Sequence, residues 1–146
     1  MMSLMGSFVY IPPTYSIITN IDREHMDYYE SLQDLNSHFE KFVNKVPSFG
    51  KSFICIDDKN NKKLIHKLKN KNFYTYGISK KSNYQIKNIK LYREYSKFNL
   101  SINLPNKKKK LIKNFIIPLL GIHNIQNSVA AIAVALTVGL SIQNIK

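Results

Sequence analysis

The chain has 146 residues, enough for one domain with a hydrophobic core. A hydrophobic fraction of 44% fits a globular protein and excludes a largely disordered one. No apolar run reaches the ~20 residues that a membrane span needs, and the first residues show no signal-peptide pattern. The only cysteine, Cys55, lies in an apolar run. We therefore expect a small buried cysteine in a cytoplasmic protein.

The net charge of +13 raises the question of a nucleic-acid partner. It comes from 20 Lys and only 2 Arg, whereas phosphate and base recognition favour the bidentate arginine side chain. Asn and Ile are also abundant, with 16 and 19 copies, and this combination is typical of an AT-rich genome. The positive charge is therefore explained better by the overall amino-acid composition than by a specific nucleic-acid site. A basic nucleic-acid-binding module that uses Lys107–Lys110 is the alternative.

The first half of the chain alternates between strand and helix patterns. Buried strands are expected at Tyr15–Ile21, Ser52–Ile56 and Phe73–Ile78, where β-branched and aromatic residues run almost unbroken. Between them, helical spacing from Asp27 to Val46 and a basic segment from Asp57–Asp58 to about Asn70 predict two helices. This order predicts a parallel sheet with flanking helices.

The second half changes character. Three more regularly alternating segments joined by short polar turns predict a small antiparallel β meander: Tyr84–Tyr92, Ser96–Leu104 and Leu111–Pro118. The tetralysine Lys107–Lys110 should lie in an exposed turn. An alanine-rich helix from His123 to Gly139, capped by Asn124 or a neighbour, should follow. The predicted fold class is α/β, a parallel sheet with flanking helices plus this meander.

The stretch Thr19–Asp27 is the densest in groups that ligate a metal or move a proton: Asp22, Glu24, His25 and Asp27. It lies between a predicted strand and a predicted helix, where open α/β sheets usually bind their ligand. Carboxylates suit magnesium, whereas imidazole suits zinc and other transition metals, so the residue types leave the metal open. Helix capping by one of the aspartates is the structural alternative.

A second polar cluster, Gly121–Asn127, precedes the alanine-rich helix. Asn124 and Asn127 are three residues apart and share one helix face, with His123 near the helix start. A glycine before a helix N-terminus lets an anion or a base approach the backbone. The structural alternative is a capped helix with a polar first turn. The 146 residues contain no Gly-x-x-x-x-Gly-Lys-Ser/Thr loop.

Both clusters resemble motifs of the Mur ligase family. Thr19-Asn20-Ile21-Asp22-Arg23-Glu24-His25-Met26-Asp27, preceded by Pro12-Pro13-Thr14-Tyr15-Ser16, is similar to one family motif. Gly121-Ile122-His123-Asn124 with Asn127 resembles the family's Gly-x-His-Asn-x-x-Asn element. Pro47-x-x-Gly50, Asp57–Asp58 and Tyr76–Gly77 also fall as in the family. The resemblance spans about residues 6 to 142.

The resemblance implies an ATP-dependent, magnesium-dependent ligase of peptidoglycan synthesis that passes through an acyl phosphate. Arg23 and the Glu-His-Met-Asp ending are similar to those members that join L-alanine to UDP-N-acetylmuramate. Carried over by motif, His25 would be a magnesium ligand, and His123, Asn124 and Asn127 would lie along the ATP. Arg23 would face the anionic substrate.

The resemblance also implies a domain organisation. Residues 1–146 correspond to part of the family's central, ATP-binding domain. The N-terminal UDP-sugar domain, the phosphate-binding loop and the C-terminal domain have no counterpart in these residues. We therefore expect the chain to be inactive alone. One piece of a split ligase, working with separately encoded flanking segments, is a further alternative.

Overall fold

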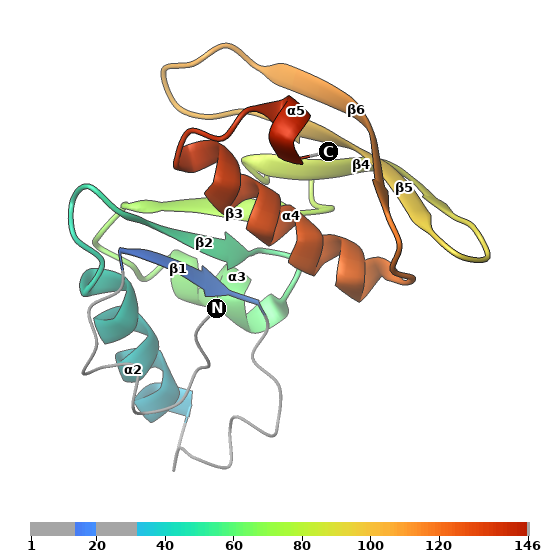
Figure 1. Cartoon of the computed structure of the whole chain (residues 1–146). Helices are drawn as coiled ribbons and strands as arrows, with labels where there is room; N and C mark the ends of the chain where they lie inside the picture. The colour runs from blue at the N-terminus through green and yellow to red at the C-terminus, as the bar shows by residue number, and fades with distance from the viewer. Residues whose placement is uncertain (1–13, 20–31, 146) are drawn as a thin grey trace. The chain divides into compact units, whose positions relative to one another are not determined.

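The computed structural model describes residues 14–19 and 32–145 (Figure 1). The chain forms two compact units, one ending at Phe73 and the other beginning at Tyr74. None of the helices in residues 14–19 and 32–145 has the length and hydrophobicity of a membrane span.

The first unit contains a parallel strand pair and two helices. Strand β1 (Tyr15–Ile18) pairs in parallel with β2 (Lys51–Cys55), with Ser16 opposite Ser52. Both serines are buried, and their hydroxyl oxygens are 2.9 Å apart in a hydrogen bond. Along the chain, helix α2 (Leu32–Asn44) lies between the two strands, and helix α3 (Lys59–Ile65) follows β2. The parallel arrangement predicted for this part of the chain is confirmed.

The core of the first unit is made by apolar residues from all four elements and from the turn after α3. Its buried members are Ile18, Phe39, Phe42, Val43, Ile54, Leu64 and Leu68. On α2, the buried residues Phe39, Phe42 and Val43 follow the helical period, which turns one face toward this core.

Gly50 ends the turn that leads from α2 into β2. Its N–H donates to the Pro47 carbonyl at 2.9 Å, and the next N–H, of Lys51, donates to the Thr14 carbonyl at 3.1 Å. A Cβ at position 50 would fall on the Thr14 carbonyl oxygen. A glycine is therefore needed because the start of β1 passes directly over this backbone.

Helix α3 begins as predicted and ends earlier than predicted. Asp58 is its N-cap, and the carboxylate accepts a hydrogen bond from the Asn61 N–H at 2.9 Å. The helix ends at Ile65, with His66 as C-cap, rather than near Asn70. The Asn70 side chain instead accepts the Asn72 N–H at 2.8 Å, forming a local turn that leads into the next strand.

The second unit holds β3 (Phe73–Gly77), apart from its first residue, and then, in sequential order, β4 (Tyr84–Leu91), β5 (Ser96–Ile102) and β6 (Lys110–Ile117). The pairs β4–β5 and β5–β6 are antiparallel, which confirms the predicted meander. Strand β4 also pairs in parallel with β3, through Tyr76 opposite Tyr84 and Gly77 opposite Gln85. The meander therefore continues a sheet instead of standing apart.

Asparagines shape the strands of this unit. Asn88 and Asn114 have positive φ angles of 53° and 66°, and a register shift occurs beside each of them. The Asn114 N–H donates to the Asn99 side chain at 3.0 Å, which supplies the acceptor that the shifted ladder lacks. Asn106, with φ 62°, makes the turn before the exposed lysines Lys107–Lys110. The exposure predicted for these lysines is confirmed.

Helix α4 (Ile122–Thr137) packs against β4 with its apolar face. The buried positions on this helix are Ile125, Val129, Ala130, Ile132 and Ala133. Gly139, with φ 99°, follows the helix C-terminus as expected, and a short helix α5 (Ile142–Ile145) then returns beside α4 (Figure 1). Helix α5 was not predicted, because four residues are too few to show a helical period.

Candidate functional site

The start of helix α4 has an accessible backbone. Gly121 occupies the N-cap position with φ 94° and ψ 151°, and no side chain caps this end. The first intrahelical hydrogen bond runs from the Ile125 N–H to the Gly121 carbonyl at 3.2 Å. The N–H groups before Ile125 therefore have no acceptor within the helix, and they carry the positive end of its dipole. A Cβ built on Gly121 would meet no atom within 4 Å, so the space beside this backbone is open.

Three predicted site residues lie together in the first two turns of α4. His123 is exposed, and Asn124 and Asn127 are half-buried. Ile125 and Val129 on the same helix are fully buried. Because these apolar residues turn toward the core, the three polar residues stay at the helix surface. The structure thus brings His123, Asn124 and Asn127 into one accessible cluster next to the free N–H groups.

Of the predicted cap positions, Asn124 or a neighbour, the structure uses the neighbouring Gly121 and not Asn124. The Asn124 side-chain nitrogen donates to the Leu120 carbonyl at 2.7 Å, one turn back along the chain. The N-cap position belongs to Gly121, which has a positive φ and no side-chain cap. Asn124 consequently ties the start of α4 to the segment that follows β6.

The acidic cluster in Thr19–Asp27, with His25 and Arg23, lies outside the described residues apart from Thr19 itself. In residues 14–19 and 32–145 there is no group of three or more His, Cys, Asp or Glu side chains that could hold a metal. A magnesium site at His25 therefore stays a prediction.

Asn61 holds the backbone at the point where that acidic stretch begins. It is fully buried, and its Nδ2 donates to the Thr19 carbonyl at 2.6 Å and to the Cys55 carbonyl at 2.9 Å. One carboxamide thus fixes the carboxyl ends of β1 and β2, the edge at which parallel sheets bind ligands. Sequence reasoning missed this residue. The available signal was a polar residue three positions after the Asp58 cap, on the side of α3 that faces the strands.

Cys55 is a core residue. Its side chain is 4% exposed, and burial raises the pKa of the thiol to about 11. The thiol therefore stays protonated at neutral pH, and the thiolate needed for nucleophilic chemistry is absent. The prediction of a small buried cysteine is confirmed.

The sequence matches a known family along most of its length. Residues 3–135 match the profile of the Mur ligase middle domain. The chain is 68% identical over 140 residues to the UDP-N-acetylmuramate–L-alanine ligase of Pelagibacter ubique, covering 96% of this chain and 30% of that protein. It is 37% identical over 143 residues to the enzyme of the same name from Brachyspira hyodysenteriae. This match covers 97% of this chain and 30% of that protein.

Solved structures agree on the fold. The UDP-N-acetylmuramate-alanine ligase MurC from Thermotoga maritima superposes with a TM-score of 0.74 at 23% identity, over 97% of this chain and 30% of that one. MurF from Acinetobacter baumannii superposes with a TM-score of 0.72 at 19% identity, over 95% of this chain and 29% of that one.

The chain spans about 30% of the length of the curated relatives that it matches. Its motifs, its α/β fold and these matches agree, and the chain belongs to the Mur ligase family, through the middle domain of those enzymes.

Proposed function

We propose that this chain is the central segment of a ligase that joins L-alanine to UDP-N-acetylmuramate in peptidoglycan synthesis. The observation that carries the proposal is the 68% identity over 140 residues to a ligase of that name. Such a role belongs to cell-wall biogenesis, and through it to cell shape and division. It places the protein in the cytoplasm.

We assign the start of α4 to ATP. The open backbone at Gly121, the exposed His123 and the half-buried Asn124 and Asn127 supply N–H and amide groups suited to a nucleotide base and ribose. MurF from Thermotoga maritima, which superposes with a TM-score of 0.64, was solved in complex with ADP. Bound ATP would supply the phosphoryl group that activates the substrate carboxylate.

We assign His25 to the magnesium ion that accompanies this ATP, and Arg23 to the anionic substrate. Both assignments rest on the motif Thr19–Asp27 alone. Asn61 supports them indirectly, because it fixes the Thr19 carbonyl from which the motif extends.

The family's phosphate-binding loop is not among the 146 residues, so ligation needs the flanking parts of the enzyme. These parts would bind the UDP sugar, the β- and γ-phosphates and the amino acid. Residues 1–146 therefore act as part of a longer ligase, or together with separately encoded segments.

A chimera tests this assignment. The matching central segment of the Pelagibacter ligase is replaced with this chain. Because the two segments are 68% identical, the replacement changes few contacts with the rest of the ligase. Asn127→Ala and His123→Ala in the chimera should raise KM for ATP about three- to tenfold, as expected for one lost hydrogen bond, and leave KM for L-alanine unchanged. Gln143→Ala, at an exposed site in α5, is the matched control. An unchanged KM for ATP in both site variants would contradict the ATP assignment.

A further inference from the structure

The charge of this protein is concentrated in one of its two units. The unit from Tyr74 onward contains twelve of the 22 Lys and Arg residues but only one of the nine carboxylates, Glu94. It therefore carries +11 of the net +13. The basic residues are spread almost evenly, ten before Tyr74 and twelve from Tyr74 onward, so the difference comes from the carboxylates, of which eight lie before Tyr74. A unit with one carboxylate attracts anions strongly.

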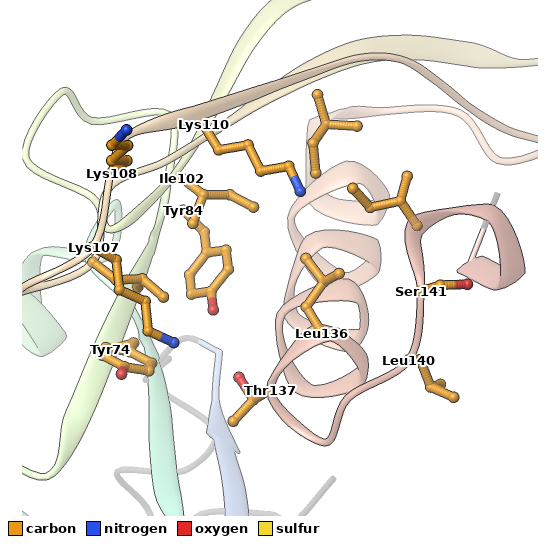
Figure 2. A pocket seen from close by; sticks show the side chains of 13 residues that line it. Tyr74, Tyr84, Ile102, Lys107, Lys108, Lys110, Leu136, Thr137, Leu140 and Ser141 are labelled. Atoms are coloured by element: carbon orange, nitrogen blue, oxygen red, sulfur yellow. The ribbon is translucent and has the colours of Figure 1, made fainter.

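Within this unit a cavity of about 490 Å³ lies between the strands and the C-terminal end of α4. This volume is in the range of small-molecule sites. Figure 2 shows Lys107 and Lys110 extending their ammonium groups toward the space between the strands and α4. Both lysines are exposed at the backbone turn that enters β6, so a ligand can reach them from solvent.

The other walls of the cavity are apolar or carry hydroxyl groups. Ile102, Ile112 and Leu136 line it, and the first two are buried. Tyr84 is 2% exposed, and its hydroxyl points toward Thr137, with which it forms a hydrogen bond (Figure 2). Its ring lies 6.1 Å from that of Tyr74 in an edge-to-face arrangement, so the cavity has an aromatic wall.

These features specify a ligand with two parts. Each of the ammonium groups of Lys107 and Lys110 is suited to donate charge-assisted hydrogen bonds to a phosphate or carboxylate. The apolar and aromatic wall accepts an aromatic or aliphatic body. A bare inorganic anion would leave this wall unused, and a neutral aromatic molecule would leave the lysines unused.

We propose that the cavity between β4–β6 and the C-terminal end of α4 binds a small organic anion with an aromatic or apolar body. This site is distinct from the nucleotide site assigned above. The two lie at opposite ends of a 16-residue helix, roughly 24 Å apart at 1.5 Å per residue. The proposal does not depend on the ligase assignment.

The test uses the 146-residue chain and phenyl phosphate, with binding followed by NMR chemical-shift changes. We expect a dissociation constant on the order of 1 mM for a ligand of this size, with shifts at the amides of residues 107–112 and 136–142. Inorganic phosphate and phenol should each bind at least fivefold more weakly. Raising the salt concentration should weaken binding.

Two double variants distinguish binding in the cavity from nonspecific attraction by the positive charge of the unit. Lys107→Gln with Lys110→Gln should weaken phenyl phosphate binding about tenfold. Lys80→Gln with Lys81→Gln removes the same charge from exposed positions of the same unit outside the cavity and should leave binding within twofold. All four side chains are exposed, so both variants should keep the wild-type spectrum.

Three results would overturn the proposal. They are equal weakening in the two double variants, inorganic phosphate binding as tightly as phenyl phosphate, and shifts confined to residues 121–127. The last result would assign the ligand to the nucleotide site instead.

Discussion

The Asn61 side chain joins helix α3 to the end of strand β1, donating from Nδ2 to the Thr19 carbonyl at 2.6 Å. The same nitrogen donates to the Cys55 carbonyl at the end of β2. Asn61 is completely buried, so removing its side chain takes away a donor inside the protein. The ends of β1 and β2 are therefore held by one carboxamide.

Asn61→Ala should lower the free energy of unfolding by about 2–3 kcal/mol, because the buried Cys55 carbonyl and the half-buried Thr19 carbonyl lose their donor. Urea unfolding followed by circular dichroism measures this. Lys62→Ala changes the next, exposed residue of the same helix and should stay within about 0.5 kcal/mol of wild type. A loss below about 1 kcal/mol in Asn61→Ala would mean that other groups hold these strand ends.

Gly50→Ala should destabilise the first unit by about 3 kcal/mol or more, because the new methyl group meets the backbone of Thr14 and cannot rotate away. Gly121→Ala is the comparison. It faces open space, so its cost comes from the backbone conformation alone: φ 94° with ψ 151° is a region that L residues rarely adopt, at about 1–3 kcal/mol. Thermal unfolding of both variants ranks the two effects. The reverse order would contradict the close passage of β1 over Gly50.

Cys55 should resist alkylation in the folded protein. Burial raises the pKa of its thiol from 9.0 to about 11, which lowers the thiolate fraction at pH 8 about 100-fold. Iodoacetamide should therefore react at least 100-fold more slowly with the folded chain than with the chain in urea. Equal rates would show that Cys55 is accessible.

The same pKa has a consequence for stability. The folded chain holds the Cys55 proton more tightly than the unfolded chain, so this contribution is complete below about pH 9 and is lost as the pH rises toward 11. Unfolding midpoints in urea should fall over this interval. Cys55→Ala should show a smaller fall over the same interval.

The purified 146-residue chain should show no magnesium-dependent ATP hydrolysis above background, because its sequence lacks a Gly-x-x-x-x-Gly-Lys-Ser/Thr loop for the phosphates. Phosphate release in a coupled assay measures this. Turnover that disappears in His123→Ala would contradict the expected inactivity, and turnover that persists in this variant would indicate a contaminating enzyme.

The sequence predicts the strands well because their signal is local. Runs such as Ser52–Ile56 are apolar and β-branched throughout, and the structure places β2 there. The end of α3 was misjudged because Leu64 and Leu68 have helical spacing and are both buried, although Leu68 follows the helix in a turn. Spacing reports which side faces the core and does not report whether the backbone remains helical.

Some of the functional clusters could be predicted from the sequence and others could not. His123, Asn124 and Asn127 are neighbours in sequence, so their grouping on α4 could be predicted. The cavity with Lys107 and Lys110 combines the β5–β6 connection with the end of α4, and only the tertiary fold brings these segments together. Asn61 was missed for the same reason, because its partners are Thr19, directly after β1, and Cys55, at the end of β2.

L-Alanine-dependent phosphate release by the chimeric ligase tests the central claim most directly. With UDP-N-acetylmuramate and ATP present, the chimera carrying this chain should release phosphate when L-alanine is added, with kcat/KM within about tenfold of the parent ligase. Omitting the UDP sugar should abolish the release. A folded chimera that releases no phosphate, or releases it regardless of L-alanine, would contradict the assignment of this chain as the central segment of such a ligase.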